Sequence, residues 1–227
     1  MTTPVVLVHG WGGSFESTWQ RSGFTELLRD AGRPVIGVDL LGHGSAPKPH
    51  DPAEYADLGA RVLEAMPADP VDAVGFSLGA ITLLRLAAQH PGRFRKVVLA
   101  GIGNNVLEPD EESGPRIVAA IEGRADASDT TANLFAQYAH QPGNDPVALA
   151  AIMQRPRFPF SAELLAAVTC PVLIVIGDKD FAGPGDPLAA AIIGSTLKVL
   201  RNVDHFATPE AFSFIDATLE FIDAIPA

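Results

Sequence analysis

Cysteine, positive charge and long apolar runs are all scarce in this chain, and each scarcity excludes a class of protein. A single cysteine, Cys170, can form neither an internal disulfide nor a cysteine zinc site, and we expect a small buried hydrophobic residue there. The 16 basic against 27 acidic side chains give a formal charge of -11, which disfavours nucleic acid and membrane surfaces as partners. No apolar run approaches the roughly 18 residues of a membrane span. The N-terminus also lacks a signal-peptide pattern, so we expect a soluble, cytoplasmic protein.

Short apolar runs rich in β-branched residues alternate with longer segments of helical periodicity. This rhythm predicts an α/β fold with a mainly parallel sheet of about six strands flanked by helices. The runs do not alternate polar with apolar residues, as expected for strands covered on both faces. The expected strands are 5–8, 34–39, 71–76, 96–100, 171–176 and 196–200. The expected helices are 18–31, 53–66, 78–90, 188–193 and 209–225.

The alternation breaks after Gly103, where about 65 residues separate two expected strands. This segment has apolar residues at helical spacing, for example Ile117, Val118 and Ile121. We expect residues 104–168 to form a small helical cap, inserted between a first part of the core at 1–103 and a second part at 169–227.

The motif Gly75-Phe76-Ser77-Leu78-Gly79 lies between an expected strand and an expected helix. A sharp strand-to-helix turn needs small neighbours around its serine, and the helix N-terminus offers N–H groups to a developing negative charge. The motif alone could be an ordinary glycine-rich turn. Its context instead indicates that Ser77 is a catalytic nucleophile.

A second glycine-rich motif, His9-Gly10-Trp11-Gly12-Gly13-Ser14, follows the first expected strand and could present a backbone N–H toward Ser77. Together with Asp39-Leu40-Leu41-Gly42-His43-Gly44-Ser45, the Ser77 motif and Gly177-Asp178-Lys179-Asp180, it makes the chain resemble the α/β-hydrolase superfamily along nearly its whole length. The motif pair is similar to those of small carboxylesterases, including pimeloyl-carrier methyl ester esterases. The resemblance implies that the backbone N–H groups of Trp11 and Leu78 form the oxyanion hole.

The resemblance also implies the strand order 2-1-3-4-5-6, with the active site at the carboxyl ends of the strands. Many relatives have one or two antiparallel strands before the first strand of this chain. We therefore expect a sheet that lacks them.

His205 is the expected general base, because it alone among six histidines lies between the last expected strand and the last expected helix. The order nucleophile, acid, histidine in the superfamily agrees with this choice. Asp178, Asp180 and Asp204 are the candidate acids. Family spacing favours Asp180, with Asp178 next, while Asp204 is too close to His205 in sequence to reach its ring. His9 is expected to be a neutral ring that hydrogen-bonds its own loop.

These residues predict a serine hydrolase that cleaves a small carboxylic ester or thioester through an acyl-enzyme, with no metal or organic cofactor. Haloalkane dehalogenases and epoxide hydrolases of this fold carry aspartate in place of Ser77. A triad-bearing lyase, a carbon–carbon bond hydrolase, a perhydrolase and a non-catalytic ligand receptor remain open, because fold does not separate them. The physiological substrate, the oligomeric state and the mobility of the cap also remain open. The candidate substrate-binding residues are Phe206, Phe135, Tyr138, Met153 and Phe158, with Trp11 and Phe76 beside the catalytic loops.

Overall fold

The computed structural model describes residues 2–226 and contains one sheet of six parallel strands. The strands are ordered β2-β1-β3-β4-β5-β6, so both the expected strand number and the expected order are confirmed. Three strands have the expected bounds, and the other three differ by one or two residues at their ends. The strands are β1 (Val5–Val8), β2 (Val35–Val38), β3 (Val71–Phe76), β4 (Phe94–Ala100), β5 (Val172–Gly177) and β6 (Thr196–Leu200).

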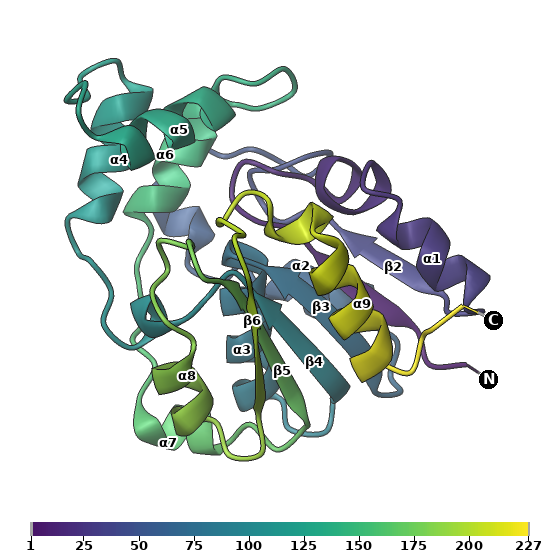
Figure 1. Ribbon diagram of the computed structural model, residues 1–227. Helices are drawn as coiled ribbons and strands as arrows, with labels where there is room; N and C mark the ends of the chain where they lie inside the picture. Colours follow the sequence, from purple (N-terminus) through teal and green to yellow (C-terminus); the bar gives the residue numbers. More distant parts are fainter. Residues whose placement is uncertain (1, 227) are drawn as a thin grey trace.

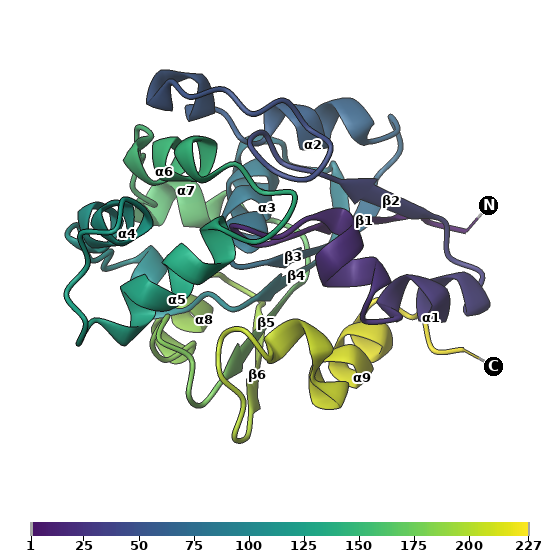
Figure 2. The same cartoon turned by 90° about the horizontal axis from the view of Figure 1, so that it is seen from above.

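Helices cover both faces of the sheet (Figures 1 and 2). On one face lie η1 (Glu16–Gln20), α1 (Phe24–Asp30) and α9 (Phe212–Phe221). On the other lie α2 (Ala60–Ala65), α3 (Leu78–Gln89), α7 (Ala162–Ala166) and α8 (Asp186–Ala191). Single turns at η2 (Pro52–Tyr55) and η4 (Thr208–Glu210) complete this part of the chain.

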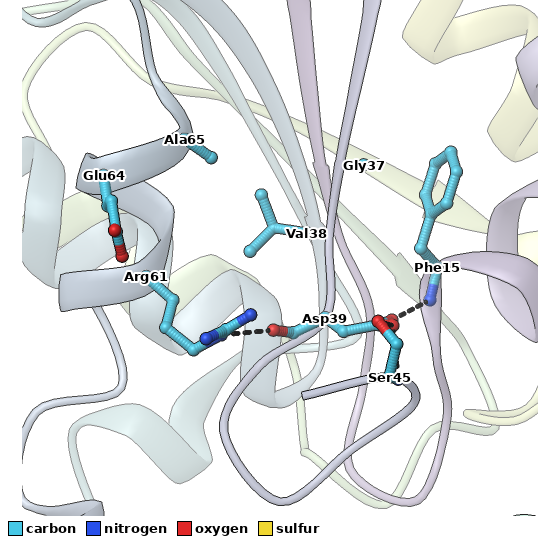
Figure 3. Close-up of a pocket in the computed structure, with 8 residues that line it drawn as sticks. All are labelled: Phe15, Gly37, Val38, Asp39, Ser45, Arg61, Glu64 and Ala65. Carbon is cyan, nitrogen blue, oxygen red and sulfur yellow. Dashed lines mark hydrogen bonds between the residues drawn. The ribbon is translucent and has the colours of Figure 1, made fainter. Parts of the chain in front are cut away.

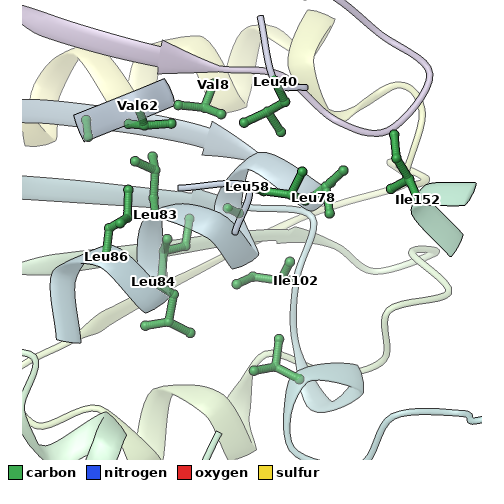
Figure 4. Packing of buried hydrophobic residues seen from close by; sticks show 14 of the residues in the cluster. Val8, Leu40, Leu58, Val62, Leu78, Leu83, Leu84, Leu86, Ile102 and Ile152 are labelled. Carbon is green, nitrogen blue, oxygen red and sulfur yellow. The ribbon is translucent and has the colours of Figure 1, made fainter. Parts of the chain in front are cut away.

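Alternate side chains of each central strand enter two separate apolar cores, as the period of two in a strand requires. Val6 and Val8 pack with α3, whereas Val5 and Leu7 pack with α1 and α9. Figure 4 shows the first core around α3, with Leu83, Leu84 and Leu86 among its buried side chains. The strands β1, β3 and β5 are buried along their whole length, which explains why their sequences do not alternate polar with apolar residues.

Three expected helices are shorter than their apolar patterns suggest. The helix expected at 18–31 is divided before α1 by Gly23, which has a φ of 77°. The one expected at 53–66 is divided between η2 and α2, where the Asp57 side chain accepts hydrogen bonds from two backbone N–H groups. The one expected at 209–225 is divided at Ala211, which is extended, with ψ 123°. Turn chemistry therefore overrides the apolar periodicity at each of these points.

Residues 104–168 contain η3 (Asn104–Val106), α4 (Ser113–Ile121), α5 (Thr130–Ala139), α6 (Pro146–Gln154) and α7. In Figure 1, α4, α5 and α6 lie together beyond the carboxyl ends of the strands, while α7 lies apart from them, beside α8. The apolar side chains of α4, α5 and α6 join the same buried core as α3. The sequence pattern did not indicate α7, whose five residues are too few to display a helical period.

Two further features complete the fold. Within residues 2–226, no helix has both the length and the apolar character needed to cross a membrane. Cys170 is only half-buried, because it lies in the surface turn between α7 and β5, so the expectation of a buried residue was wrong. The thiol is free, and burial of part of the side chain raises its pKa.

An ion-pair network holds the end of α9 to the sheet. The fully buried carboxylate of Asp72 on β3 accepts hydrogen bonds from Arg33 and Arg95. Both guanidinium groups also donate to the carbonyl oxygen of Ile222, directly after α9. Asp72 lies near the amino end of β3, so this network is at the opposite end of the sheet from Ser77.

Candidate active site

Ser77 lies in a sharp turn between β3 and α3, with φ 51° and ψ −113°. This positive φ is costly for a residue with a Cβ, and the surrounding structure must impose it. The backbone N–H of Ser77 donates to the Ala100 carbonyl oxygen at 2.8 Å, which fixes the turn to β4. Two glycines allow the close approach of α3: a Cβ at Gly75 would lie 2.7 Å from the Ala80 nitrogen, and one at Gly79 would lie 2.4 Å from the Val8 carbonyl oxygen.

The structure brings Ser77, His205 and Asp180 together in a hydrogen-bonded row. The Nδ1 atom of His205 lies 2.9 Å from both carboxylate oxygens of Asp180. Its Nε2 atom lies 3.0 Å from the Ser77 Oγ atom. A carboxylate only accepts hydrogen bonds, so the imidazole proton lies on Nδ1 and the Nε2 lone pair faces the serine hydroxyl. His205 and Asp180 are buried, while Ser77 is partly accessible.

The two other candidate acids lie away from the imidazole. The Asp178 carboxylate is exposed and accepts a hydrogen bond from the Asn202 N–H at 2.7 Å. The Asp204 carboxylate accepts one from the Ala207 N–H at 2.9 Å. Asp180 accepts a further hydrogen bond from the Ala182 N–H at 2.8 Å, so its carboxylate is held from two directions.

The loop His9–Ser14 runs beside the serine, and we call it the oxyanion loop after the role that the sequence predicts for it. The backbone of Gly10 is so close that a Cβ there would lie 3.3 Å from the Cβ of Ser77. Gly10 to Gly13 form a tight turn closed by a 3.1 Å hydrogen bond from the Gly13 N–H to the Gly10 carbonyl oxygen. Gly12 takes a φ of 74° in this turn, a value that strongly favours glycine.

His9, the first residue of the oxyanion loop, is a neutral ring that connects this loop to the loop after β2. The Leu40 N–H donates to His9 Nε2 at 3.1 Å, so the ring proton lies on Nδ1, which is 2.7 Å from the Gly10 carbonyl oxygen. Complete burial lowers the pKa of His9. Burial and the neighbouring His9 also hold the pKa of His43 well below its ordinary value, with the two ring centroids 4.9 Å apart. His9 therefore has the geometry expected for it.

The remaining histidines lie in other places. His50 pairs with Asp145 at 2.9 Å, His90 ends α3, and His140 contacts the Ile121 carbonyl oxygen at 3.0 Å. Among residues 2–226, no group of three or more histidine, cysteine or acidic side chains could hold a metal ion.

Five aromatic side chains form a connected cluster that contacts His205 through Phe181 and Phe206, and we call this cluster the aromatic wall. Tyr138 stacks on Phe206 with 5.0 Å between ring centroids, and Phe135 lies 5.1 Å from Trp11. Sequence reasoning missed Phe181, whose ring centroid is 4.2 Å from that of His205. Because Phe181 directly follows the candidate acid Asp180, its place in the sequence could have indicated that it lies near the site. The members of the aromatic wall are Trp11, Phe135, Tyr138, Phe181 and Phe206.

Three other candidates lie differently. Phe76 is buried, with its ring centroid 5.0 Å from that of His205, and it belongs to the core beneath α9. Met153 is on α6 and packs against the core around α3. Phe158 is 57% exposed and lies near the Arg85 guanidinium of α3, so the structure does not bring it to Ser77. Its position in the open loop before α7 explains why apolar character alone was misleading.

A cavity of about 450 Å³ lies at the β2 edge of the sheet (Figure 3). Its lining includes Phe15, Asp39, Arg61 and Glu64, and it contains none of Ser77, His205 and Asp180. The Asp39 carboxylate already accepts hydrogen bonds from the N–H groups of Phe15 and Ser45, and the Arg61 side chain donates to the Asp39 carbonyl oxygen. These polar groups are therefore engaged in holding the loop after β2.

Comparisons with known proteins agree with this architecture. Residues 5–216 match the model of the alpha/beta hydrolase family. The pimeloyl-[acyl-carrier protein] methyl ester esterase of Neisseria meningitidis serogroup B (strain H44/76) is 32% identical, over 88% of this chain and 85% of that protein. The 2-hydroxymuconate semialdehyde hydrolase of Pseudomonas sp. (strain CF600) is 36% identical over 43% of this chain and 36% of its own length. The crystal structure of a hydrolase from Pseudomonas aeruginosa PA01 superposes with a TM-score of 0.77 at 23% identity, covering 97% of this chain and 90% of that one.

Proposed function

Because this chain belongs to the alpha/beta hydrolase family, we propose that it is a serine hydrolase that cleaves a small carboxylic ester or thioester through an acyl-enzyme on Ser77. The observation that carries the proposal is the hydrogen-bonded row from Ser77 Oγ through His205 to Asp180, with distances of 3.0 and 2.9 Å. In this mechanism His205 removes the hydroxyl proton as the oxygen attacks the carbonyl carbon of the substrate. Asp180 holds the ring in the tautomer that can accept that proton.

The oxyanion hole in this proposal consists of the backbone N–H groups of Trp11 and Leu78. Leu78 is the first residue of α3, so its N–H has no acceptor inside the helix and lies at the positive end of the helix dipole. Trp11 lies in the turn that passes beside Ser77. Protonated His205 then returns its proton to the leaving alcohol or thiol, and water hydrolyses the acyl-enzyme with His205 again as base.

We assign the role of a cap to residues 104–168, with α5 as its substrate-facing helix. Phe135 and Tyr138 on α5 contribute two of the five rings of the aromatic wall. These rings give the acyl group an apolar surface, which favours short apolar acyl chains over charged ones. Phe206 and Phe181 extend this surface from the loops that carry His205 and Asp180. Met153 of α6, partly buried against the core around α3, is a further candidate.

Labelling with a fluorophosphonate tests the proposal most directly, because the reagent forms a bond to an activated serine. We expect labelling of the wild type and none of Ser77→Ala, together with turnover of p-nitrophenyl acetate and butyrate by the wild type alone. Ser14→Ala is a matched control, because Ser14 lies in the oxyanion loop but its hydroxyl contacts only Ser17. A folded wild-type protein that is neither labelled nor active would refute the proposal and favour a ligand-binding role.

The similarity to 2-hydroxymuconate semialdehyde hydrolase supports a second candidate, hydrolysis of a carbon–carbon bond next to a carbonyl group. The same serine, histidine and aspartate could serve both reactions. The match covers less than half of the chain, whereas the esterase match covers 88%. Turnover of a vinylogous 1,5-diketone at a higher kcat/KM than p-nitrophenyl butyrate would favour this second candidate.

A further inference from the structure

The turn that carries Trp11 is closed by hydrogen bonds within the oxyanion loop itself. The Gly10 carbonyl oxygen accepts hydrogen bonds from the Gly13 N–H and from the His9 ring. Three of the four residues in this turn are glycines, which have little conformational stiffness of their own. The direction of the Trp11 N–H therefore depends on contacts that reach the turn from outside.

Those outer contacts come from the junction between α5 and α6. The Asn144 side-chain nitrogen donates to the Gly12 carbonyl oxygen at 2.8 Å and to the Tyr138 carbonyl oxygen, near the end of α5, at 2.8 Å. An amide NH₂ group has two N–H donors, so both are used. A second link runs from the Trp11 indole Nε1 to the Leu149 carbonyl oxygen of α6 at 3.2 Å.

We propose that Asn144 is a positioning residue for the oxyanion hole, and that its amide fixes the Gly10–Gly13 turn so that the Trp11 N–H points at the tetrahedral intermediate. This inference rests on the proposed serine-hydrolase function. Asn144 is 132 residues from Gly12 in sequence, so the contact makes the geometry of the oxyanion loop depend on where α5 and α6 lie. Packing also links the loop to α5, because a Cβ at Gly12 would be 3.4 Å from the Tyr138 Cβ.

The chemistry of the site explains why an amide suits this position. Both of its partners are carbonyl oxygens, so the position requires a side chain with two donors on one atom. Asn144→Ala removes both bonds, while Asn144→Asp keeps the shape and places an acceptor against two acceptors. A hydrogen-bond donor that points away from the developing oxyanion contributes little to its stabilisation.

Steady-state kinetics with p-nitrophenyl butyrate, together with inhibition by butaneboronic acid, test this inference. Loss of one oxyanion donor typically costs about 10² to 10³ in kcat, so a misplaced donor should lower kcat of Asn144→Ala by about 10- to 100-fold. KM should change less than about threefold, because the ground-state ester depends little on this donor. The Ki of butaneboronic acid, which forms a tetrahedral adduct with serine, should rise by a factor similar to the loss of kcat. Asn144→Asp should lose at least as much.

Asn133→Ala is the matched control. Its side-chain nitrogen also donates to two carbonyl oxygens, those of Asp126 and Asp129, at 3.0 and 2.8 Å. Both acceptors lie in the turn just before α5, so these bonds are local and do not reach the oxyanion loop. We expect its kcat and Ki to stay within about twofold of the wild type, because it does not touch the oxyanion loop.

The possible failures are distinguishable. A wild type inert to fluorophosphonate would overturn the proposed function and this inference with it. An active wild type, with Asn144 variants that resemble Asn133→Ala or that change KM and not kcat, would overturn the inference alone. Asn144 variants that both lose their folded state would also overturn it, because the residue would then be structural.

Discussion

Replacing Asp180 by asparagine should abolish most activity while leaving the fold intact, because the hydrogen bonds around Asp180 dictate how the new amide must turn. The Ala182 N–H donates to the Asp180 Oδ1 atom at 2.8 Å. In Asp180→Asn the amide oxygen must take this bond at the Oδ1 position, so the NH₂ group occupies the Oδ2 position, which is also 2.9 Å from His205 Nδ1, and donates to that nitrogen. The imidazole then carries its proton on Nε2, where it donates to Ser77 and can no longer accept the hydroxyl proton.

The expected loss in kcat/KM is about 10³- to 10⁴-fold, the size typical of a triad whose histidine is held in the wrong tautomer. This corresponds to about 4 to 5.5 kcal/mol of transition-state stabilisation, at 1.36 kcal/mol per factor of ten. Release of p-nitrophenolate from the butyrate ester measures the rate, and thermal unfolding checks that the Asp180 variant remains folded. The substitution conserves shape, so Tm should fall by only a few degrees, because about 1 kcal/mol corresponds to about 2–4 °C in a chain of this size.

Asp178→Asn is the matched control, because it makes the same chemical change two residues earlier. The Asp178 carboxylate accepts from the Asn202 N–H and is exposed, so its replacement should leave kcat/KM within about threefold of the wild type. A folded Asp180→Asn protein with more than a tenth of wild-type activity would refute the tautomer argument. An equal loss in Asp178→Asn would refute the choice of Asp180 as the acid.

Three further predictions concern stability. Asp72→Ala leaves two arginines without their buried partner, so it should lower the free energy of unfolding by about 3–5 kcal/mol, or Tm by about 6–20 °C. The control Asp223→Ala removes a carboxylate of the same network whose side chain is 65% exposed, and it should cost less than about 1 kcal/mol. Gly79→Ala places a Cβ 2.4 Å from the Val8 carbonyl oxygen and should lower Tm by about 6–12 °C with loss of turnover. Below pH 6.5 His43 is protonated in the unfolded chain but not in the folded chain, where its pKa is lowered, so the free energy of unfolding should fall as pH drops. His43→Phe should reduce the dependence of this free energy on pH by up to about 1.4 kcal/mol per pH unit. Urea unfolding from pH 7 to 5 measures the change. An unchanged Tm in Asp72→Ala or Gly79→Ala, or an unchanged slope in His43→Phe, would contradict the corresponding prediction.

The sheet could be predicted from the sequence because its strands are short apolar runs bounded by glycine, proline or charged residues. β1, β3 and β6 have the expected bounds, and the strand order agrees with the order that the family resemblance implied. Helix ends were harder to predict. The breaks at Gly23 and Ala211 depend on backbone angles of single residues, which an apolar period averaged over three turns does not reveal.

The row of Ser77, His205 and Asp180 could be anticipated because each residue lies in the loop or turn after a strand, namely β3, β6 and β5, and parallel strands end at the same edge of the sheet. Strand order then brings residues that are 128 positions apart in sequence to within 3.0 Å of each other. Asn144 had no such signal. Its position depends on where the loop between α5 and α6 turns, and a single polar residue in a loop looks the same whether or not it has a distant partner.

The proposed catalytic groups lie in loops after strands, whereas part of the proposed substrate surface comes from the inserted helices. Three rings of the aromatic wall come from the loops after β1, β5 and β6, which also carry the proposed catalytic groups, whereas Phe135 and Tyr138 come from α5. Because α5 contributes no group to the proposed proton transfer, its two rings can change the preferred acyl group without changing the chemistry. The Asn144 hydrogen bonds limit this freedom, since any substitution that moves α5 also moves the Tyr138 carbonyl oxygen that holds the Asn144 amide, and this amide donates to Gly12 of the oxyanion loop.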